Sequence, residues 1–268
     1  MKKVAIIIDN PLRDLEGLVL LAASLATKDI EVYLIGMYDQ DFDVIANNID
    51  LVVFNYLRKN NVERFKRFKK KGIKVGVLDT EGAGEKDDNA YANVISQTGL
   101  SEYLDFFCCW GSGQYKALLK RRLISKERLF ETGNPRYDFC SQKYTNFYIS
   151  KNTKDFSLIN TNFPLANRKF SNNEQAELNN FIKIGYSKDA AKFRLSETKK
   201  TFLKMKEFLK ELIEKFQNES FVLRPHPFED SKPYSGLLVF DNVSLNTSGS
   251  SMRQISNCKN LIHLNCLT

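Results

Sequence analysis

The feature that most constrains the fold is a regular alternation of short apolar runs with stretches of helical periodicity. Residues 4–8 form a continuous, mostly β-branched run, and apolar residues then recur at helical spacing over residues 15–26. Similar apolar runs follow at residues 31–35, 50–55, 73–78 and 104–110. Continuous apolar strands that alternate with helices are typical of right-handed βαβ units and of a parallel sheet covered on both faces. The sequence therefore predicts an α/β fold.

A change of composition divides the chain into two predicted lobes. Residues 141–155 are polar and are interpreted as a linker between an N-terminal Rossmann-like lobe, 1–140, and a second Rossmann-like lobe, 156–268. The second lobe carries an amphipathic helix over residues 198–216 and a last strand over residues 259–265. Eight apolar residues of this helix are expected on one core-facing side: Phe202, Leu203, Met205, Phe208, Leu209, Leu212, Ile213 and Phe216. No helix follows the last strand to cover it, so the second lobe is expected to be truncated at its C-terminus.

The segment 221–227, Phe-Val-Leu-Arg-Pro-His-Pro, combines a strand with two stiffened polar residues. Proline fixes φ and biases the preceding residue towards an extended conformation, so Arg224 and His226 should project from the carboxyl end of the strand. Ligands of open α/β sheets bind at that end. A guanidinium beside an imidazole suits a phosphate or carboxylate. The alternative is a strand exit with a solvated Arg224 and a helix-capping His226.

Three further loops follow predicted strands. Residues 79–84 place Asp79 and Glu81 around a threonine, which favours a general base or a ribose ligand over a simple turn with a helix cap. Gly-Ser-Gly at 111–113 is a weak phosphate signal and is better explained as a strand-to-helix turn. Residues 132–138 contain Gly, Asn and Pro in sequence and predict a fixed turn, with Arg136 and Asp138 at its polar tip.

The composition limits the partners of the chain. The net charge is +8, and the basic runs at 64–71, 116–122 and 199–215 are interpreted as solvated helix faces, with attraction to an anionic membrane surface or anionic substrates as the alternative. No nucleic-acid motif accompanies the charge, so nucleic acid is not expected. Five cysteines without C-x-x-C spacing indicate reduced, mostly buried thiols and no metal site. No run approaches the ~20 apolar residues of a membrane span, so a cytoplasmic location is expected, with the inner membrane face as the alternative site.

Several short blocks together resemble a known family. They are residues 9–22, 78–82, 132–138 and 224–227, extended by 160–164 and 262–266. In this order they resemble the bacterial surface carbohydrate (surface polysaccharide) biosynthesis proteins, which have a GT-B-like arrangement of two lobes. The His-Pro element is also similar to that of capsule Kdo and sialic acid transferases, where it contacts the nucleotide phosphate of a CMP-sugar. In such relatives the last block continues into a Thr-Gly-x-Glu helix start, whereas this sequence ends at Thr268.

The resemblance implies a glycosyltransferase of the metal-independent GT-B type, without a cofactor, that moves a sugar from a CMP- or UDP-linked donor to a glycan or lipid-linked acceptor. The expected roles are stabilisation of the departing phosphate by His226 and activation of the acceptor by Asp79 or Glu81. The expected donor-binding residues are Arg224, His226, Ser248, Ser250, Ser251 and Asn134, and the expected acceptor-binding residues are Arg13 and Asp14. Two alternatives stay open: an enzyme like the UDP-sugar 2-epimerases, and a non-catalytic or inactive fragment of the family.

Overall fold

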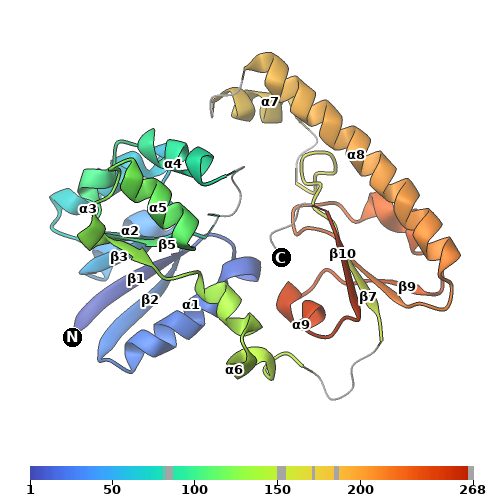
Figure 1. The fold of residues 1–268 in the computed structure, drawn as a ribbon, viewed down its shortest axis with the longest axis horizontal. Helices are drawn as coiled ribbons and strands as arrows, with labels where there is room; N and C mark the ends of the chain where they lie inside the picture. Colours follow the sequence, from blue (N-terminus) through green and yellow to red (C-terminus); the bar gives the residue numbers. More distant parts are fainter. Residues whose placement is uncertain (81, 83–86, 150–154, 171–172, 184–186, 265–268) are drawn as a thin grey trace. The chain divides into compact units, whose positions relative to one another are not determined.

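The computed structural model describes residues 1–80, 82, 87–149, 155–170, 173–183 and 187–264, which group into two compact units (Figure 1). The first unit is Met1–Asn146 and the second is Phe147–Cys266. The boundary between them falls inside the segment 141–155 that was interpreted as a linker, and the short helix α6 (Gln142–Thr145) lies on its N-terminal side. Each unit contains its own parallel sheet.

The sheet of the first unit has six strands among the described residues, in the order β2-β1-β3-β4-β5-β6. The strands are β1 (Lys2–Ile8), β2 (Ile30–Gly36), β3 (Leu51–Phe54), β4 (Lys74–Leu78), β5 (Phe106–Cys109) and β6 (Leu129–Glu131). Every neighbouring pair is parallel; Val4 of β1, for example, is paired with Val32 of β2 and Leu51 of β3. The predicted parallel α/β sheet is therefore confirmed.

Helices cover both faces of this sheet because successive side chains of a strand point to opposite sides. Ala5 and Ile7 belong to a core that includes apolar residues of α2 (Gln40–Ala46), α3 (Val62–Lys70), α4 (Asp88–Ser96) and α5 (Ser112–Lys120). Val4, Ile6 and Ile8 belong to a separate core with α1 (Pro11–Ala26). Single-turn 3-10 helices lie at η1 (Lys59–Asn61), η2 (Ser101–Tyr103) and η3 (Lys126–Arg128).

A close backbone approach fixes α1 against the turn after β6. That turn is a 3-10 helix, η4 (Pro135–Cys140). A β-carbon added at Gly17 of α1 would lie 2.5 Å from the backbone nitrogen of Arg136. Only glycine permits this spacing, so Gly17 determines how near the two elements come.

The second unit contains a parallel sheet of four strands among its described residues, in the order β10-β7-β8-β9. The strands are β7 (Ser157–Asn160), β8 (Phe221–Arg224), β9 (Val243–Leu245) and β10 (Asn260–His263). The helices are α7 (Glu174–Lys183), α8 (Lys188–Lys215), η5 (Lys232–Leu237) and α9 (Ser251–Ile255). Strand β9 was not predicted, and α8 begins at Lys188, before the predicted start at residue 198.

The core-facing side of α8 is narrower than predicted. Phe202, Leu209 and Ile213 are buried in a core with β7 and β8. Three of the eight residues predicted on this side, Leu203, Phe208 and Phe216, are exposed instead. In a helix of 3.6 residues per turn, positions 202, 209 and 213 align. Leu203 and Phe208 each lie one position away and are rotated by about 100°, and Phe216 lies just beyond the last helical residue. The prediction of a single eight-residue face is therefore wrong.

Candidate functional site

In the first unit, polar residues from four strand ends meet at the carboxyl edge of the sheet. Asp9 follows β1, Asp79 follows β4, Trp110 follows β5 and Asn134 follows β6. Parallel strands place their carboxyl ends together, and this edge is the usual ligand-binding edge of open α/β sheets. The first turn of α1 adds Arg13 to the same group of residues.

Arg13 and Asp14 are the centre of an ion-pair cluster at this edge. The Nη2 atom of Arg13 lies 2.8 Å from Asp9 Oδ2 and 2.8 Å from Asp14 Oδ2. Arg136 Nη1 lies 3.4 Å from Asp14 Oδ1, and both of these side chains are buried. Arg136 was predicted at the polar tip of its turn; its burial beside Asp14 corrects that prediction. The side chain of Arg13 is 24% exposed, so it is the member of the predicted acceptor-binding pair that can reach a ligand.

Asp79 is buried and hydrogen-bonded within the protein. Its Oδ2 accepts a hydrogen bond from the Tyr91 hydroxyl at 2.6 Å. Burial, and then the charge of Asp79, raise the pKa of Tyr91 well above its usual value, so Tyr91 remains a proton donor to this carboxylate. The backbone carbonyl of Asp79 accepts bonds from Asn134 Nδ2 at 2.9 Å and from the Trp110 indole N–H. Glu81, the other predicted carboxylate, lies outside the described residues.

The side-chain amide of Asn134 forms hydrogen bonds within the protein through both its nitrogen and its oxygen. Its Nδ2 holds the carbonyl of Asp79, and its Oδ1 accepts the backbone N–H of Arg136 at 3.0 Å as the cap of η4. Its role in donor binding stays a prediction. The observed contacts explain why a Gly-Asn-Pro turn follows β6: it fastens the loop after β4 to the loop after β6.

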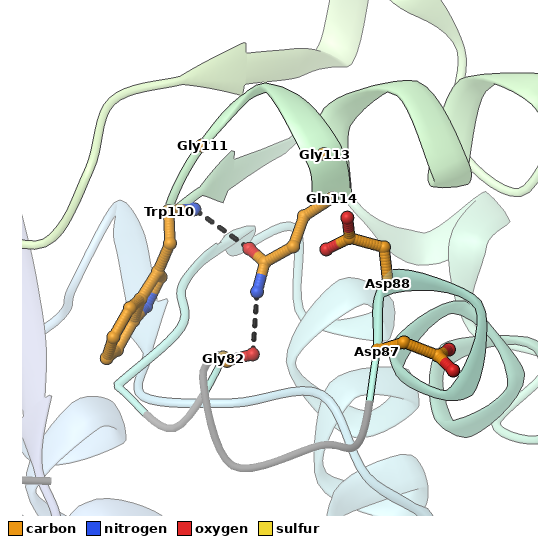
Figure 2. Close-up of a pocket in the computed structure, with 7 residues that line it drawn as sticks. All are labelled: Gly82, Asp87, Asp88, Trp110, Gly111, Gly113 and Gln114. Atoms are coloured by element: carbon orange, nitrogen blue, oxygen red, sulfur yellow. Dashed lines mark hydrogen bonds between the residues drawn. The ribbon is translucent and has the colours of Figure 1, made fainter.

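A pocket of about 420 Å³ opens beside these loops (Figure 2). The described residues that line it are Gly82, Asp87, Asp88, Trp110, Gly111, Gly113 and Gln114. Gln114 is buried; its Oε1 accepts the backbone N–H of Trp110 at 3.0 Å, and its Nε2 donates to the carbonyl of Gly82 at 2.7 Å. The sequence interpretation did not identify Trp110, Asp88 or Gln114. The only signal was the glycine pair on either side of Ser112, after a buried strand.

The start of α5 already has a carboxylate beside it. A β-carbon at Gly113 would lie 2.1 Å from Asp88 Oδ2, and Figure 2 shows Asp88 pointing towards this turn. A carboxylate is favourable at the positive end of a helix, where a phosphate would otherwise bind. Gly111 is the N-cap of α5, as expected for a strand-to-helix turn. The contacts of Asp88 do not favour the phosphate alternative.

In the second unit, Arg224 is largely buried and holds the loop that follows β9. Its Nη1 lies 2.9 Å from the carbonyl of Ser248 and 2.9 Å from Gln254 Oε1. Burial lowers the pKa of this guanidinium from its usual value. Ser250 caps α9 by accepting the backbone N–H of Met252 at 3.2 Å, and Ser251 is the first residue of that helix. The hydroxyl-rich turn therefore caps a short helix, as predicted from the sequence.

His226 is held by a residue that the sequence interpretation missed. The buried carboxylate of Glu229 accepts the backbone N–H of His226 at 3.2 Å, the hydroxyl of Thr161 at 2.9 Å and the backbone N–H of Phe163 at 2.8 Å. It also accepts the hydroxyl of Tyr234 at 2.6 Å. Glu229 thus joins the loop after β7 to the loop after β8. Nothing in the sequence pattern distinguishes it from an exposed glutamate.

The half-buried imidazole of His226 has an oriented ring and aromatic neighbours. Its Nδ1 accepts the backbone N–H of Phe228 at 3.2 Å, so the neutral ring carries its proton on Nε2. The rings of His226 and Phe228 are 5.5 Å apart, and those of Phe228 and Phe170 are 6.0 Å apart. Phe228 is 51% exposed and Phe170 is 74% exposed. This edge therefore presents aromatic surface to solvent next to an N–H donor.

The described residues contain no group of three or more His, Cys, Asp or Glu side chains that could hold a metal ion. The thiols of Cys108, Cys109, Cys140 and Cys258 are free. Burial raises the pKa of Cys109 to about 12, which makes it unreactive. Cys108 and Cys258 are half-buried and Cys140 is exposed, so the described thiols are less buried than expected. None of the described helices is long and apolar enough to cross a bilayer.

Comparison with known proteins identifies the fold. No family model and no curated protein matches the sequence. Among solved structures, that of S. aureus MnaA with UDP aligns over 98% of this chain and 74% of its own, with a TM-score of 0.60 and 12% identity. A UDP-GlcNAc 2-epimerase from Neisseria meningitidis bound to UDP-GlcNAc aligns over 98% of this chain and 77% of its own, with a TM-score of 0.55 and 14% identity. The predicted α/β fold with two Rossmann-like lobes of the GT-B type is confirmed.

Proposed function

We propose that this chain is a nucleotide-sugar enzyme that transfers a sugar to a glycan or lipid-linked acceptor in bacterial surface polysaccharide synthesis. The observation that carries the proposal is the setting of His226. Proline residues stand on both sides of it, Glu229 fixes its backbone, and Phe228 lies against its ring at the carboxyl edge of the sheet. A fixed imidazole with a proton on Nε2 can donate to a phosphate oxygen and can stabilise the charge that develops as the sugar departs.

The aromatic surface beside His226 supports a nucleotide as the ligand. A nucleobase stacks favourably on an exposed aromatic ring. Phe228 and Phe170 offer such rings near His226, the residue proposed to donate a hydrogen bond to the phosphate. The net charge of +8 also favours the approach of an anionic donor. Arg224 would contribute positive charge near the phosphate and hold Ser248 in place.

The acceptor is assigned to the first unit. Arg13, which is partly exposed, would bind it, held in position by its ion pair with the buried Asp14. Either Asp79 or Glu81 would activate the acceptor hydroxyl; Asp79 would have to give up its bond from Tyr91 to do so. We propose that the reaction needs no metal and takes place in the cytoplasm. The basic helix faces would attract the chain to the inner membrane surface, where lipid-linked acceptors are found.

The second candidate is a UDP-sugar 2-epimerase. One observation favours it: a solved structure of the same fold is a UDP-GlcNAc 2-epimerase bound to its sugar nucleotide. The reaction of an epimerase changes the configuration of the sugar on the nucleotide and needs no acceptor.

Product analysis separates the candidates. The chain is incubated with UDP-GlcNAc or a CMP-sugar, with and without a glycan acceptor, and the nucleotide products are resolved. Release of free nucleotide only when acceptor is present supports the transferase. Isomerised nucleotide sugar without acceptor supports the epimerase. Calorimetry with CMP, UDP and CDP is the accompanying test; no binding of any of them contradicts both candidates and leaves a non-catalytic protein.

A further inference from the structure

We infer that the pocket at the start of α5, lined by Trp110, Asp88 and Gln114, binds an uncharged sugar ring and is not a phosphate site. The inference deepens the proposed function, because it names the class of group that the acceptor presents. The volume of the pocket, about 420 Å³, falls within the range of about 300–1,000 Å³ that is usual for small-molecule sites.

The groups around the pocket match a polyhydroxylated ring. Asp88 is exposed at the first position of α4, and its carboxylate can accept hydrogen bonds from sugar hydroxyls. Trp110 is one of the lining residues, and an indole can pack against the C–H groups of a sugar ring. Gly111 carries no side chain, and a β-carbon added there would meet nothing within 4 Å, so a ligand can approach the backbone at this point of the turn.

An anion does not fit this set of groups. None of the described residues that line the pocket is basic, and two of them, Asp87 and Asp88, are acidic. The carboxylate of Asp88 also stands at the start of α5, where the helix would otherwise attract a phosphate. A divalent cation is no better served. Asp87 Oδ1 accepts the N–H of Ala90 at 2.8 Å as a helix cap, whereas Ca²⁺ needs about six to eight oxygen ligands.

The aromatic side of the pocket is held in place before a ligand arrives. The Trp110 indole N–H donates to the carbonyl of Asp79, and its ring meets that of Tyr137 edge-on at 5.3 Å. The guanidinium of Arg136 lies 5.6 Å from the indole centroid. Gln114 bonds to both the backbone of Trp110 and the backbone of Gly82. The Trp110 ring is therefore already fixed when a ligand binds, and the protein loses little conformational entropy on binding.

Intrinsic fluorescence tests the inference directly, because Trp110 is the one tryptophan in the sequence. The full chain is titrated with methyl glycosides of glucose, galactose, N-acetylglucosamine and N-acetylgalactosamine, and separately with inorganic phosphate. We expect a saturable change in emission with at least one methyl glycoside and no saturable change with phosphate. Asp88→Asn should weaken glycoside binding roughly tenfold, since it removes a charged acceptor. Asp241→Asn, an exposed aspartate of the second unit, should leave it unchanged.

Two results would overturn the inference: no saturable response to any of the glycosides, or a response to phosphate that Asp88→Asn strengthens. Calorimetry of the same protein with UDP and CMP keeps this test separate from that of the proposed function. Glycoside binding without nucleotide binding would refute the proposed function and leave the sugar pocket standing. Nucleotide binding without glycoside binding would do the reverse.

Discussion

Glu229 and His226 bond to each other twice. The backbone N–H of Glu229 donates to the carbonyl of His226 at 2.8 Å, and Glu229 Oε1 accepts the backbone N–H of His226 at 3.2 Å. The same oxygen accepts bonds from Thr161 and Phe163 in the neighbouring loop. A single buried carboxylate therefore fixes both the turn that carries His226 and the loop beside it.

The first prediction concerns this carboxylate. Glu229→Gln keeps the shape of the side chain but removes its charge, and hydrogen bonds to a charged group contribute about 1.5–3 kcal/mol. We expect the free energy of unfolding to fall by about this amount and UDP or CMP binding to weaken as His226 loses its fixed position. Urea unfolding and calorimetry measure the two effects. Glu207→Gln, on the exposed side of α8, is the control and should change neither.

The second prediction concerns catalysis by His226. In a preparation that turns over a nucleotide sugar, His226→Ala should lower kcat by roughly 10²–10³, the usual effect of removing one group that stabilises transition-state charge. His263→Ala changes the only other histidine of the sequence and should have little effect. Steady-state kinetics of both variants provide the measurement. Normal turnover by His226→Ala would exclude the proposed role.

The third prediction separates base recognition from phosphate recognition. Phe228→Ala removes the exposed ring beside His226, and base stacking on an aromatic side chain contributes about 1–3 kcal/mol. We therefore expect UDP binding to weaken roughly 5- to 150-fold, while pyrophosphate binding stays the same. Calorimetry with both ligands measures this difference. Phe193→Ala, which removes an exposed phenylalanine of α8, should alter neither affinity. Equal losses for UDP and pyrophosphate would show that Phe228 does not contact the base.

The strands and the longest helices could be predicted from the sequence because their signals are local. The apolar runs of β1, β3 and β4 and the amphipathic pattern within α8 are visible without a partner. The short helix α2, with seven residues, and the strand β9, with three, are too short to show a period. These two elements depend on contacts with the rest of the first and second sheets, respectively, and a single sequence does not show such contacts.

The site was predicted less completely, for a physical reason. Arg224 and His226 could be predicted as site residues because each is followed by a proline, which indicates a constrained backbone next to an ionisable group. Glu229 and Gln114 act through bonds to backbone groups that are 66 and 32 residues away in sequence. Trp110 becomes part of a pocket only because Gly82 and Asp88 are brought beside it. The roles of these residues depend on their neighbours in space, so the local sequence pattern does not indicate them.

The last prediction tests the close contact between α1 and η4, which supports Arg136 and its partner Asp14. A methyl group at Gly17 would lie 2.5 Å from the Arg136 backbone nitrogen, and backbone cannot move aside as a flexible side chain can. Gly17→Ala should therefore lower the free energy of unfolding by about 1–3 kcal/mol, as overpacking usually does. This loss is expected even though alanine has a higher helix propensity than glycine. Gly236→Ala is the matched control, because its added carbon would meet nothing within 4 Å. Urea unfolding of both variants is the measurement. A Gly17→Ala protein as stable as the wild type would mean that α1 and η4 separate at little cost, and that Arg136 is not held against Asp14 by this contact.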